Sequence, residues 1–169
     1  MVSKIYIDLE SLETQSIHLY HGSNTIVNEP EIRIGKYTKD FYWGFYCTSI
    51  KKQAEKWAMR NRKSKIVNIY TLGNIKGLRC KQFKKMNDEW LEFIVKCRNG
   101  ESHDYEIVEG PMADDTIYNY INDYIDGIIS KTAFWELVKF KYPTHQLSLH
   151  TARALSCLKF EGSYEINDI

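Results

Sequence analysis

Short runs in which apolar and polar residues alternate recur along the whole chain. Alternation with a period of two is typical of strands with one buried face, and β-branched and aromatic residues favour strands further. The run FYWGFYCT is the richest in such residues, and the run SIHLYH ends in a histidine that is followed by glycine. The pattern predicts strands at 3–9, 16–21, 41–48, 64–72, 103–110, 145–150 and 157–166.

Four other segments carry apolar residues at the three- and four-residue spacing of a helix face. We expect these helices at 50–60, 87–97, 116–125 and 131–140. The apolar face of the first is formed by Ile50, Ala54, Trp57 and Ala58.

Short polar residues stand before two of these helices, where they can accept hydrogen bonds from free backbone N–H groups. Ser49 is the candidate cap of the helix at 50–60. Asp114 or Asp115 can cap the helix that begins at Thr116.

The order of these elements predicts an α+β protein. Strands outnumber what a helical bundle allows, and the helices do not alternate strictly with them. A chain of 169 residues with 43% hydrophobic residues can build one core, and its three prolines mark no linker. We therefore expect a single domain over 1–169.

Composition excludes several classes of protein without naming one. The 23 basic and 22 acidic residues leave a formal charge of +1, so no overall field directs the chain to nucleic acid or membrane. Cys47, Cys80, Cys97 and Cys157 have no CxxC spacing, and we read them as reduced thiols. Neither a signal peptide nor a membrane span is indicated, which favours the cytoplasm.

Three short segments suggest a ligand site: 20–23 (YHGS), 44–49 (GFYCTS) and 53–58 (QAEKWA). If the strand at 41–48 runs into the next helix, Tyr46 and Trp57 form opposite walls of a slot. Such a slot suits a flat, positively charged ring, because aromatic faces attract cations. The alternative is that both rings are ordinary core residues and that His21 is a structural histidine.

These segments, in this order, resemble the ADP-ribosyltransferase superfamily, in the clade of diphtheria toxin and the poly(ADP-ribose) polymerases. The resemblance rests on Tyr-His-Gly-Ser, then Gly-Phe-Tyr-x-Thr, then an aromatic residue eleven positions after the tyrosine. It covers 17–72, with a weaker match at 142–160. It implies a fold of two small, strongly bent sheets with NAD held in the cleft between them and helices on the flanks.

The resemblance also implies roles for individual residues. His21 would bind the ribose hydroxyl next to the nicotinamide, and the backbone of Gly22 would fix the carboxamide. Tyr46 and Trp57 would sandwich the nicotinamide ring. The residues expected to help hold the ribose or the phosphates are Ser23, Thr48 and Ser49.

The third motif of the superfamily, a glutamate on a late strand, is not matched. Gln146 stands at the corresponding position, and an amide offers a dipole where a carboxylate offers a charge. Asp115 is a candidate substitute, although capping a helix is its simpler role. The expected function is therefore single ADP-ribose transfer from NAD, without a metal, rather than polymer synthesis.

Other interpretations of the same residues stay open. The chain can be a module that binds NAD or ADP-ribose and has lost the reaction. The cations between 51 and 65 form a solvated helix face or contact the NAD diphosphate or a nucleic-acid acceptor. The acceptor, protein or nucleic acid, is not specified by these residues; kinship with bacterial toxins suggests a toxin–antitoxin or phage-defence role and an antitoxin partner.

Overall fold

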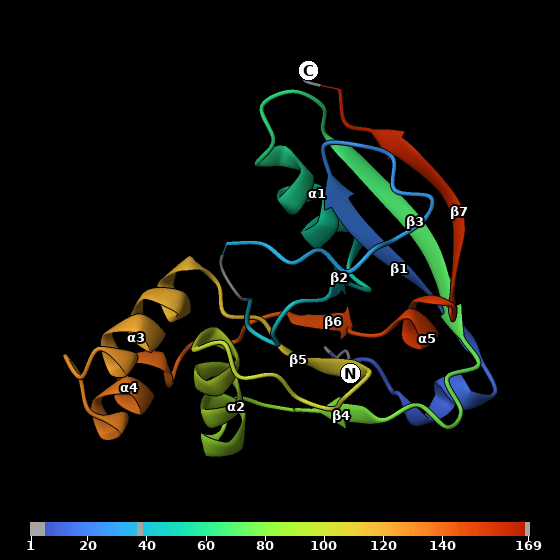
Figure 1. Cartoon of the computed structure of the whole chain (residues 1–169). Helices are drawn as coiled ribbons and strands as arrows, with labels where there is room; N and C mark the ends of the chain where they lie inside the picture. The colour runs from blue at the N-terminus through green and yellow to red at the C-terminus, as the bar shows by residue number, and fades with distance from the viewer. Residues whose placement is uncertain (1–5, 37–38, 168–169) are drawn as a thin grey trace.

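The computed structural model describes residues 6–36 and 39–167, and it shows an α+β protein with two small sheets (Figure 1). A three-stranded antiparallel sheet has the order β1-β3-β7. A four-stranded sheet has the order β2-β6-β5-β4, in which only the β4–β5 pair is parallel among the described strands. The strands are β1 (Ser16–Ser23), β2 (Phe45–Cys47), β3 (Ile66–Gly73), β4 (Cys80–Gln82), β5 (Ile107–Pro111), β6 (His145–Leu149) and β7 (Leu158–Glu165).

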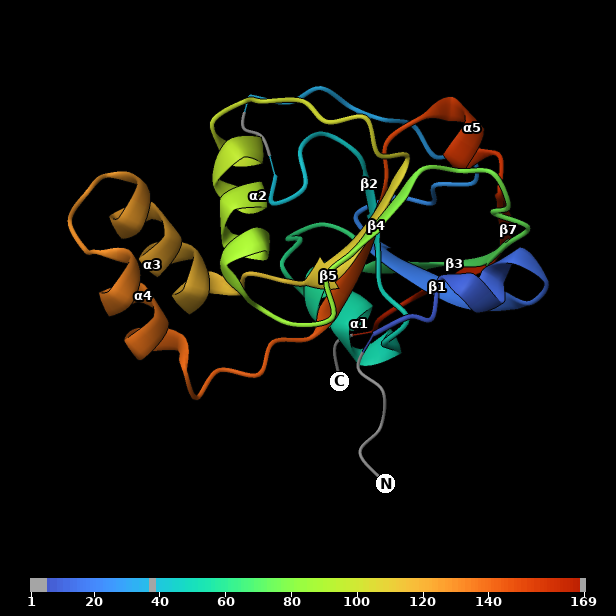
Figure 2. The same ribbon diagram turned by 90° about the horizontal axis from the view of Figure 1, so that it is seen from below.

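Most of the helices lie on the outer faces of the two sheets. The helices are α1 (Lys51–Met59), α2 (Asp88–Arg98), α3 (Asp115–Ile125), α4 (Lys131–Val138) and α5 (Ala152–Leu155), with a short 3-10 helix η1 at Glu10–Glu13. Helix α1 packs on the three-stranded sheet through Ala54 and Ala58. Helices α3 and α4 lie together at one side of the molecule, with α2 between them and the four-stranded sheet (Figures 1 and 2).

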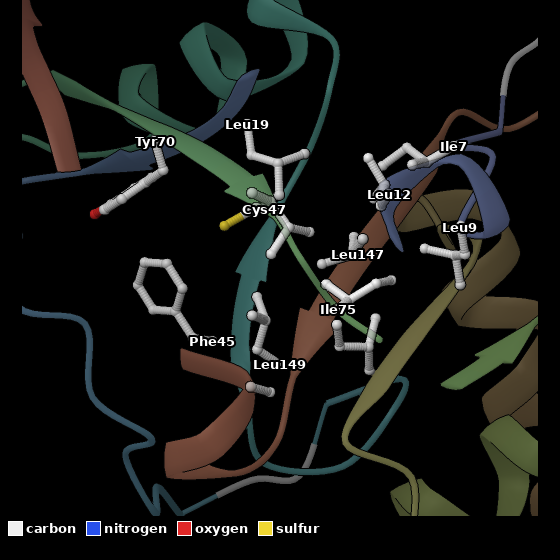
Figure 3. Close-up of a cluster of buried hydrophobic side chains, with 13 residues drawn as sticks. Ile7, Leu9, Leu12, Leu19, Phe45, Cys47, Tyr70, Ile75, Leu147 and Leu149 are labelled. Atoms are coloured by element: carbon white, nitrogen blue, oxygen red, sulfur yellow. The ribbon is translucent and has the colours of Figure 1, made fainter. Parts of the chain in front are cut away.

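The main core fills the space between the two sheets. It joins apolar residues of β1 and β3 to those of β2, β5 and β6, and η1 contributes Leu12 (Figure 3). Along β6 the side chains alternate, so Leu147 and Leu149 enter this core while Gln146 and Ser148 face the other way. A second cluster packs that other face against α2, α3 and α4.

The predicted helices are confirmed, and so are most of the predicted strands. In the part of the chain that the structure describes, four helices begin with a side-chain cap that accepts a hydrogen bond from the backbone N–H three residues on, and the capping residues are Asn87, Asp114, Ser130 and Thr151. The expectation for Ser49 is wrong. The N-cap of α1 is Ile50, and its N–H donates to the hydroxyl of Thr48 at 3.1 Å instead.

Several strand predictions need correction. Residues 6–9 are not a strand, and 3–5 lie outside the described residues. The strand expected at 41–48 is shorter, because 40–44 form a turn in which Tyr42 has a positive φ of 76°. The strand expected from 103 begins at Ile107, and the three-residue β4 and the four-residue α5 were missed because such short elements carry too little periodicity.

The two sheets meet where β1 passes the end of β2. Tyr20 and Thr48 form an isolated antiparallel bridge with two backbone hydrogen bonds of 2.8 and 3.0 Å. The two segments run in opposite directions, and Nδ1 of His21 on β1 lies 2.7 Å from the carbonyl oxygen of Tyr46 on β2. The expected first and second motifs are therefore neighbours.

Candidate functional site

A cavity of about 400 Å³ lies at this junction of the two sheets. Its walls come from β1, β2, β6, α1, α3, the C-terminal end of α2 and the loop before β2. Six residues expected at the site line it: His21, Gly22, Tyr46, Trp57, Asp115 and Gln146. A larger hollow of about 500 Å³ next to α4 contains none of these.

His21 is fixed by a hydrogen bond from its Nδ1 to the carbonyl oxygen of Tyr46, at 2.7 Å. A carbonyl oxygen only accepts, so Nδ1 carries the proton. The pKa of His21 is lowered, mainly because burial disfavours the charged imidazolium, with Lys39 adding to the effect. In this neutral tautomer Nε2 is an acceptor that can bind a ligand hydroxyl.

Tyr46 is almost fully buried, and its hydroxyl is committed to the protein. The hydroxyl donates to the carbonyl oxygen of Tyr42 at 2.5 Å and accepts from the N–H of Phe41 at 3.0 Å. Burial, together with the nearby Asp40, raises the pKa of Tyr46 well above its usual value. Only the ring of Tyr46 is therefore available to a ligand.

A cation already lies over that ring. The Nζ atom of Lys39 is 4.8 Å from the centroid of Tyr46. Although part of the Lys39 side chain is exposed, burial of its ammonium lowers its pKa, opposed by the charge of Asp40. The slot beside Tyr46 thus attracts positive charge, as expected for aromatic faces, and a flexible side chain of the protein occupies part of it.

Gly22 brings helix α1 close to the cavity. A Cβ at this position would lie 2.2 Å from the carbonyl oxygen of Ala54 and 2.9 Å from Cβ of Trp57. Since real contacts are never this short, only glycine permits the close approach of β1 and α1. This approach sets the position of the half-buried Trp57 at the cavity wall.

Gln146 lies on the same face of the four-stranded sheet as Tyr46. Tyr46 pairs with Ser148 across the β2–β6 ladder, and Gln146 is two residues before Ser148. The side chain of Gln146 is 5% exposed, and its Nε2 donates to Oδ2 of Asp40 at 3.1 Å.

Asp40 is a buried acid in the wall of this cavity that the sequence did not reveal. Its Oδ1 forms an ion pair with the guanidinium of Arg98, and its Oδ2 accepts from the N–H of Ala113 at 3.1 Å as well as from Gln146. Both side chains of the ion pair are buried, with 8% of Asp40 and 11% of Arg98 exposed. Asp40 ends a polar loop, and no local spacing signals a site there.

Asp115 and Asp114 divide the two roles expected for this acidic pair. Asp114 caps α3 by accepting from the N–H of Ile117 at 2.9 Å. Asp115 lies at the rim of the cavity with 90% of its side chain exposed, and it forms an ion pair with Arg60 at 3.6 Å. In that place its charge is screened by solvent.

The remaining expected residues lie apart from this cavity. Thr48 is fully buried and uses its hydroxyl at the start of α1, and Ser49 is exposed; neither lines the cavity. Ser23 lines a neighbouring cavity of about 320 Å³, which shares His21, Lys39 and Tyr46 with the first. The two cavities are thus neighbours that share these three residues.

Two further expectations concern metals and membranes. Over the described residues, no group of three or more His, Cys, Asp or Glu side chains is placed to hold a metal ion. Among the helices at 6–36 and 39–167, none has the length and apolar character needed to cross a membrane. The four cysteines form no disulfide with one another.

The fold and the site define an α+β protein with a cavity of charged and aromatic side chains where two small sheets meet. Residues 17–160 match the family described as a protein of unknown function, DUF3990, so the chain belongs to this family. No curated protein and no solved structure matches the chain.

Proposed function

We propose that this protein is a mono-ADP-ribosyltransferase that cleaves NAD at the bond between nicotinamide and ribose. One observation carries the proposal: His21, Tyr46, Trp57 and Gln146, which come from four separate elements, line a single cavity. Convergence of an aromatic wall, an oriented neutral imidazole and a buried polar network is typical of a ligand site rather than of a core. The proposed fold is that of the ADP-ribosyltransferases, with NAD between the two sheets.

In this proposal each side chain has a defined task. Tyr46 and Trp57 hold the pyridinium ring, and Nε2 of His21 accepts a hydrogen bond from a ribose hydroxyl. The adjoining cavity lined by Ser23 takes the adenosine side of the dinucleotide. The acid Asp115, exposed and paired with Arg60, contributes at most at the rim.

The reaction is a displacement at the anomeric carbon of the ribose. The bond to nicotinamide breaks, its electron pair leaves with neutral nicotinamide, and a nucleophilic atom of the acceptor bonds to the same carbon. The acceptor loses its proton to solvent. Positive charge grows on the ribose in between, as in glycoside cleavage, and the amide oxygen of Gln146 supports it.

The test is release of nicotinamide from labelled NAD, with pure protein and with cell lysate. His21→Asn is the sharpest variant, because an Asn amide can still donate to the carbonyl of Tyr46 while Nε2 is lost. We expect it to fold normally and to lose about a hundredfold in turnover, the usual cost of one preorganised group. Full activity in His21→Asn would remove the imidazole from the proposed reaction.

Nuclease and protease treatment of the labelled lysate then distinguishes a nucleic-acid acceptor from a protein acceptor. A role as a toxin and an antitoxin partner belong to the same proposal and rest on resemblance, whereas the proposed cytoplasmic location rests on the sequence pattern. Expression of active protein and of His21→Asn in the same host tests toxicity directly.

The second candidate is a module that binds NAD or ADP-ribose without reacting. Two observations favour it: Gln146 stands where the superfamily has a glutamate, and Lys39 covers the ring of Tyr46. Binding of NAD by calorimetry, with no nicotinamide released in any lysate, would select this candidate over the enzyme.

A further inference from the structure

The carboxylate of Asp40 and the amide of Gln146 form a directed pair within the cavity wall. A carboxylate accepts and does not donate, so the end of the amide that faces Asp40 is the NH₂ group. The orientation of the amide is thereby determined by its partner. Its oxygen is the end that remains to serve a ligand in the cavity that Gln146 lines.

The two oxygens of Asp40 have separate partners. Oδ1 is bound to Arg98, whereas Oδ2 receives the hydrogen bonds of Gln146 and Ala113. Arg98 is in turn held in place, because its guanidinium lies 4.0 Å from the ring centroid of Tyr118. The carboxylate is therefore fixed in the position that meets the amide.

A hydrogen bond to a buried carboxylate also changes the amide itself. Hydrogen bonds in series polarise one another, and charge-assisted ones do so most. The negative charge of Asp40 pushes electron density from the N–H side of Gln146 toward the amide oxygen. The oxygen thus carries more negative charge than the oxygen of an isolated glutamine.

We propose that Asp40 is a positioning residue that acts through Gln146, so that the negative charge which supports the ribose cation originates in the loop before β2 rather than on strand β6. This inference rests on the proposed function and adds to it the source of the charge. It explains how a glutamine can stand at this position in an active enzyme. It also assigns a function to a loop residue outside all three motifs.

The test is a cycle of three variants measured against the native protein by nicotinamide release: Asp40→Asn, Gln146→Glu and the double exchange. Asp40→Asn removes the charge and leaves the amide of Gln146 without a fixed direction. We expect kcat to fall by about tenfold or more, with a small change in KM for NAD. The exposed Asp104→Asn is the matched control, since it makes the same chemical change outside the cavity.

Gln146→Glu puts two carboxylates within hydrogen-bond distance, with Arg98 as the neighbouring cation. At low pH one of them keeps a proton and imitates the native pair, and as pH rises both ionise and repel each other. We expect this variant to lose activity with rising pH in a step that the native protein lacks.

The double exchange moves the amide to position 40 and the carboxylate to position 146. The amide on the loop then donates and the carboxylate on β6 accepts, so the hydrogen bond between the two positions is kept with its direction reversed, while the N–H of Ala113 loses its acceptor at position 40. The negative charge also returns to the cavity wall. Asp40→Asn is expected to lose about tenfold or more in kcat. We expect the double exchange to regain that loss, so that its kcat is at least about tenfold higher than the kcat of Asp40→Asn.

Stability and orientation are measured separately from turnover. Asp40→Asn also removes the partner of Arg98, so melting temperatures are compared for all variants. The side-chain NH₂ resonances of Gln146, observed by ¹⁵N NMR, should move in Asp40→Asn and stay unchanged in Asp104→Asn. This measurement needs no turnover.

The outcomes separate the two proposals. A native protein that releases no nicotinamide overturns the proposed enzyme, while the NMR result still decides whether Asp40 orients Gln146. An unchanged Gln146 resonance in Asp40→Asn overturns the inference. So does a lowered melting temperature with unchanged kcat, or a double exchange whose loss is simply the sum of the two single losses.

Discussion

The ammonium of Lys39 lies 4.8 Å from the centre of the Tyr46 ring. Tyr46 lines the cavity together with His21 and Gln146. A pyridinium and this ammonium compete for the same aromatic face, since both are attracted by the same quadrupole. Entry of a cationic ring therefore requires that the Lys39 side chain swing away.

Replacing Lys39 tests this competition. Lys39→Met keeps the length of the side chain and removes its charge, so we expect NAD to bind several-fold more tightly, by about 1 kcal/mol. Calorimetry of NAD binding measures the change, with the exposed Lys76→Met as control. Weaker binding in Lys39→Met would mean that the ammonium contacts the ligand, for instance its phosphates.

Trp57 tests the second aromatic wall. It is half-buried on α1, so its replacement disturbs the core less than a change at Tyr46 does. We expect Trp57→Ala to weaken NAD binding by about tenfold and Trp57→Phe to retain most of it, because a flat ring is what the slot needs. If Trp57→Ala and Trp57→Phe bound NAD with the same affinity, Trp57 would not contact the ligand.

Gly22 links stability to the cavity. In Gly22→Ala the new methyl group meets the backbone of Ala54 at 2.2 Å, so α1 must move outward. We expect a loss of about 1–3 kcal/mol in the free energy of unfolding, the usual cost of overpacking, together with weaker NAD binding. Urea denaturation measures the free energy of unfolding of Gly22→Ala, with Ser23→Ala as control. Equal stability of the two variants would contradict the close approach of Gly22 to Ala54.

His150 makes stability depend on pH. Its Nδ1 donates to the carbonyl oxygen of Trp43 at 2.8 Å and its Nε2 is 2.7 Å from the hydroxyl of Ser148. Burial, and secondarily the ring of His103, lowers the pKa of His150 to about 4, opposed by the bond to Trp43.

The sign of this effect follows from linkage. Below its ordinary pKa of about 6.5 the histidine of the unfolded chain takes up a proton, while the folded one stays neutral. Stability contributed by neutral His150 is complete above pH 6.5 and is lost as pH falls toward 4, by about 3 kcal/mol. Urea denaturation of native protein and His150→Gln at several pH values measures this, and an equal acid slope in both would contradict it.

Local sequence predicted most of the elements because their periodicity is long enough to read. Helices α1 to α4 and the strands β1, β3, β6 and β7 lie within a few residues of the predicted ranges. The same alternation places Tyr46 and Gln146 on one face of a sheet once β2 pairs with β6. The pairing of β2 with β6 cannot be predicted from the local pattern, since it depends on how the whole core packs.

The charged part of the cavity was missed for a related reason. Asp40 and Arg98 are 58 positions apart, one at the end of a polar loop and one at the last turn of a helix, and each looks like an ordinary surface residue. Only the tertiary structure removes both from water and makes them partners. The role of Gly22 in packing α1 could not be predicted either. A motif shows which residue is present, but it does not show which atoms a larger side chain would contact.

The backbone bridge between Tyr20 and Thr48 has a consequence for how ligands are selected. His21 and Gln146 belong to different sheets, so their separation is set by the angle at which the sheets meet and by the apolar residues packed between them. A substitution such as Leu147→Val, deep in that shared core, therefore alters the width of the opening without touching any polar group in it. Selectivity of the proposed NAD site would to that extent be a property of the interior packing.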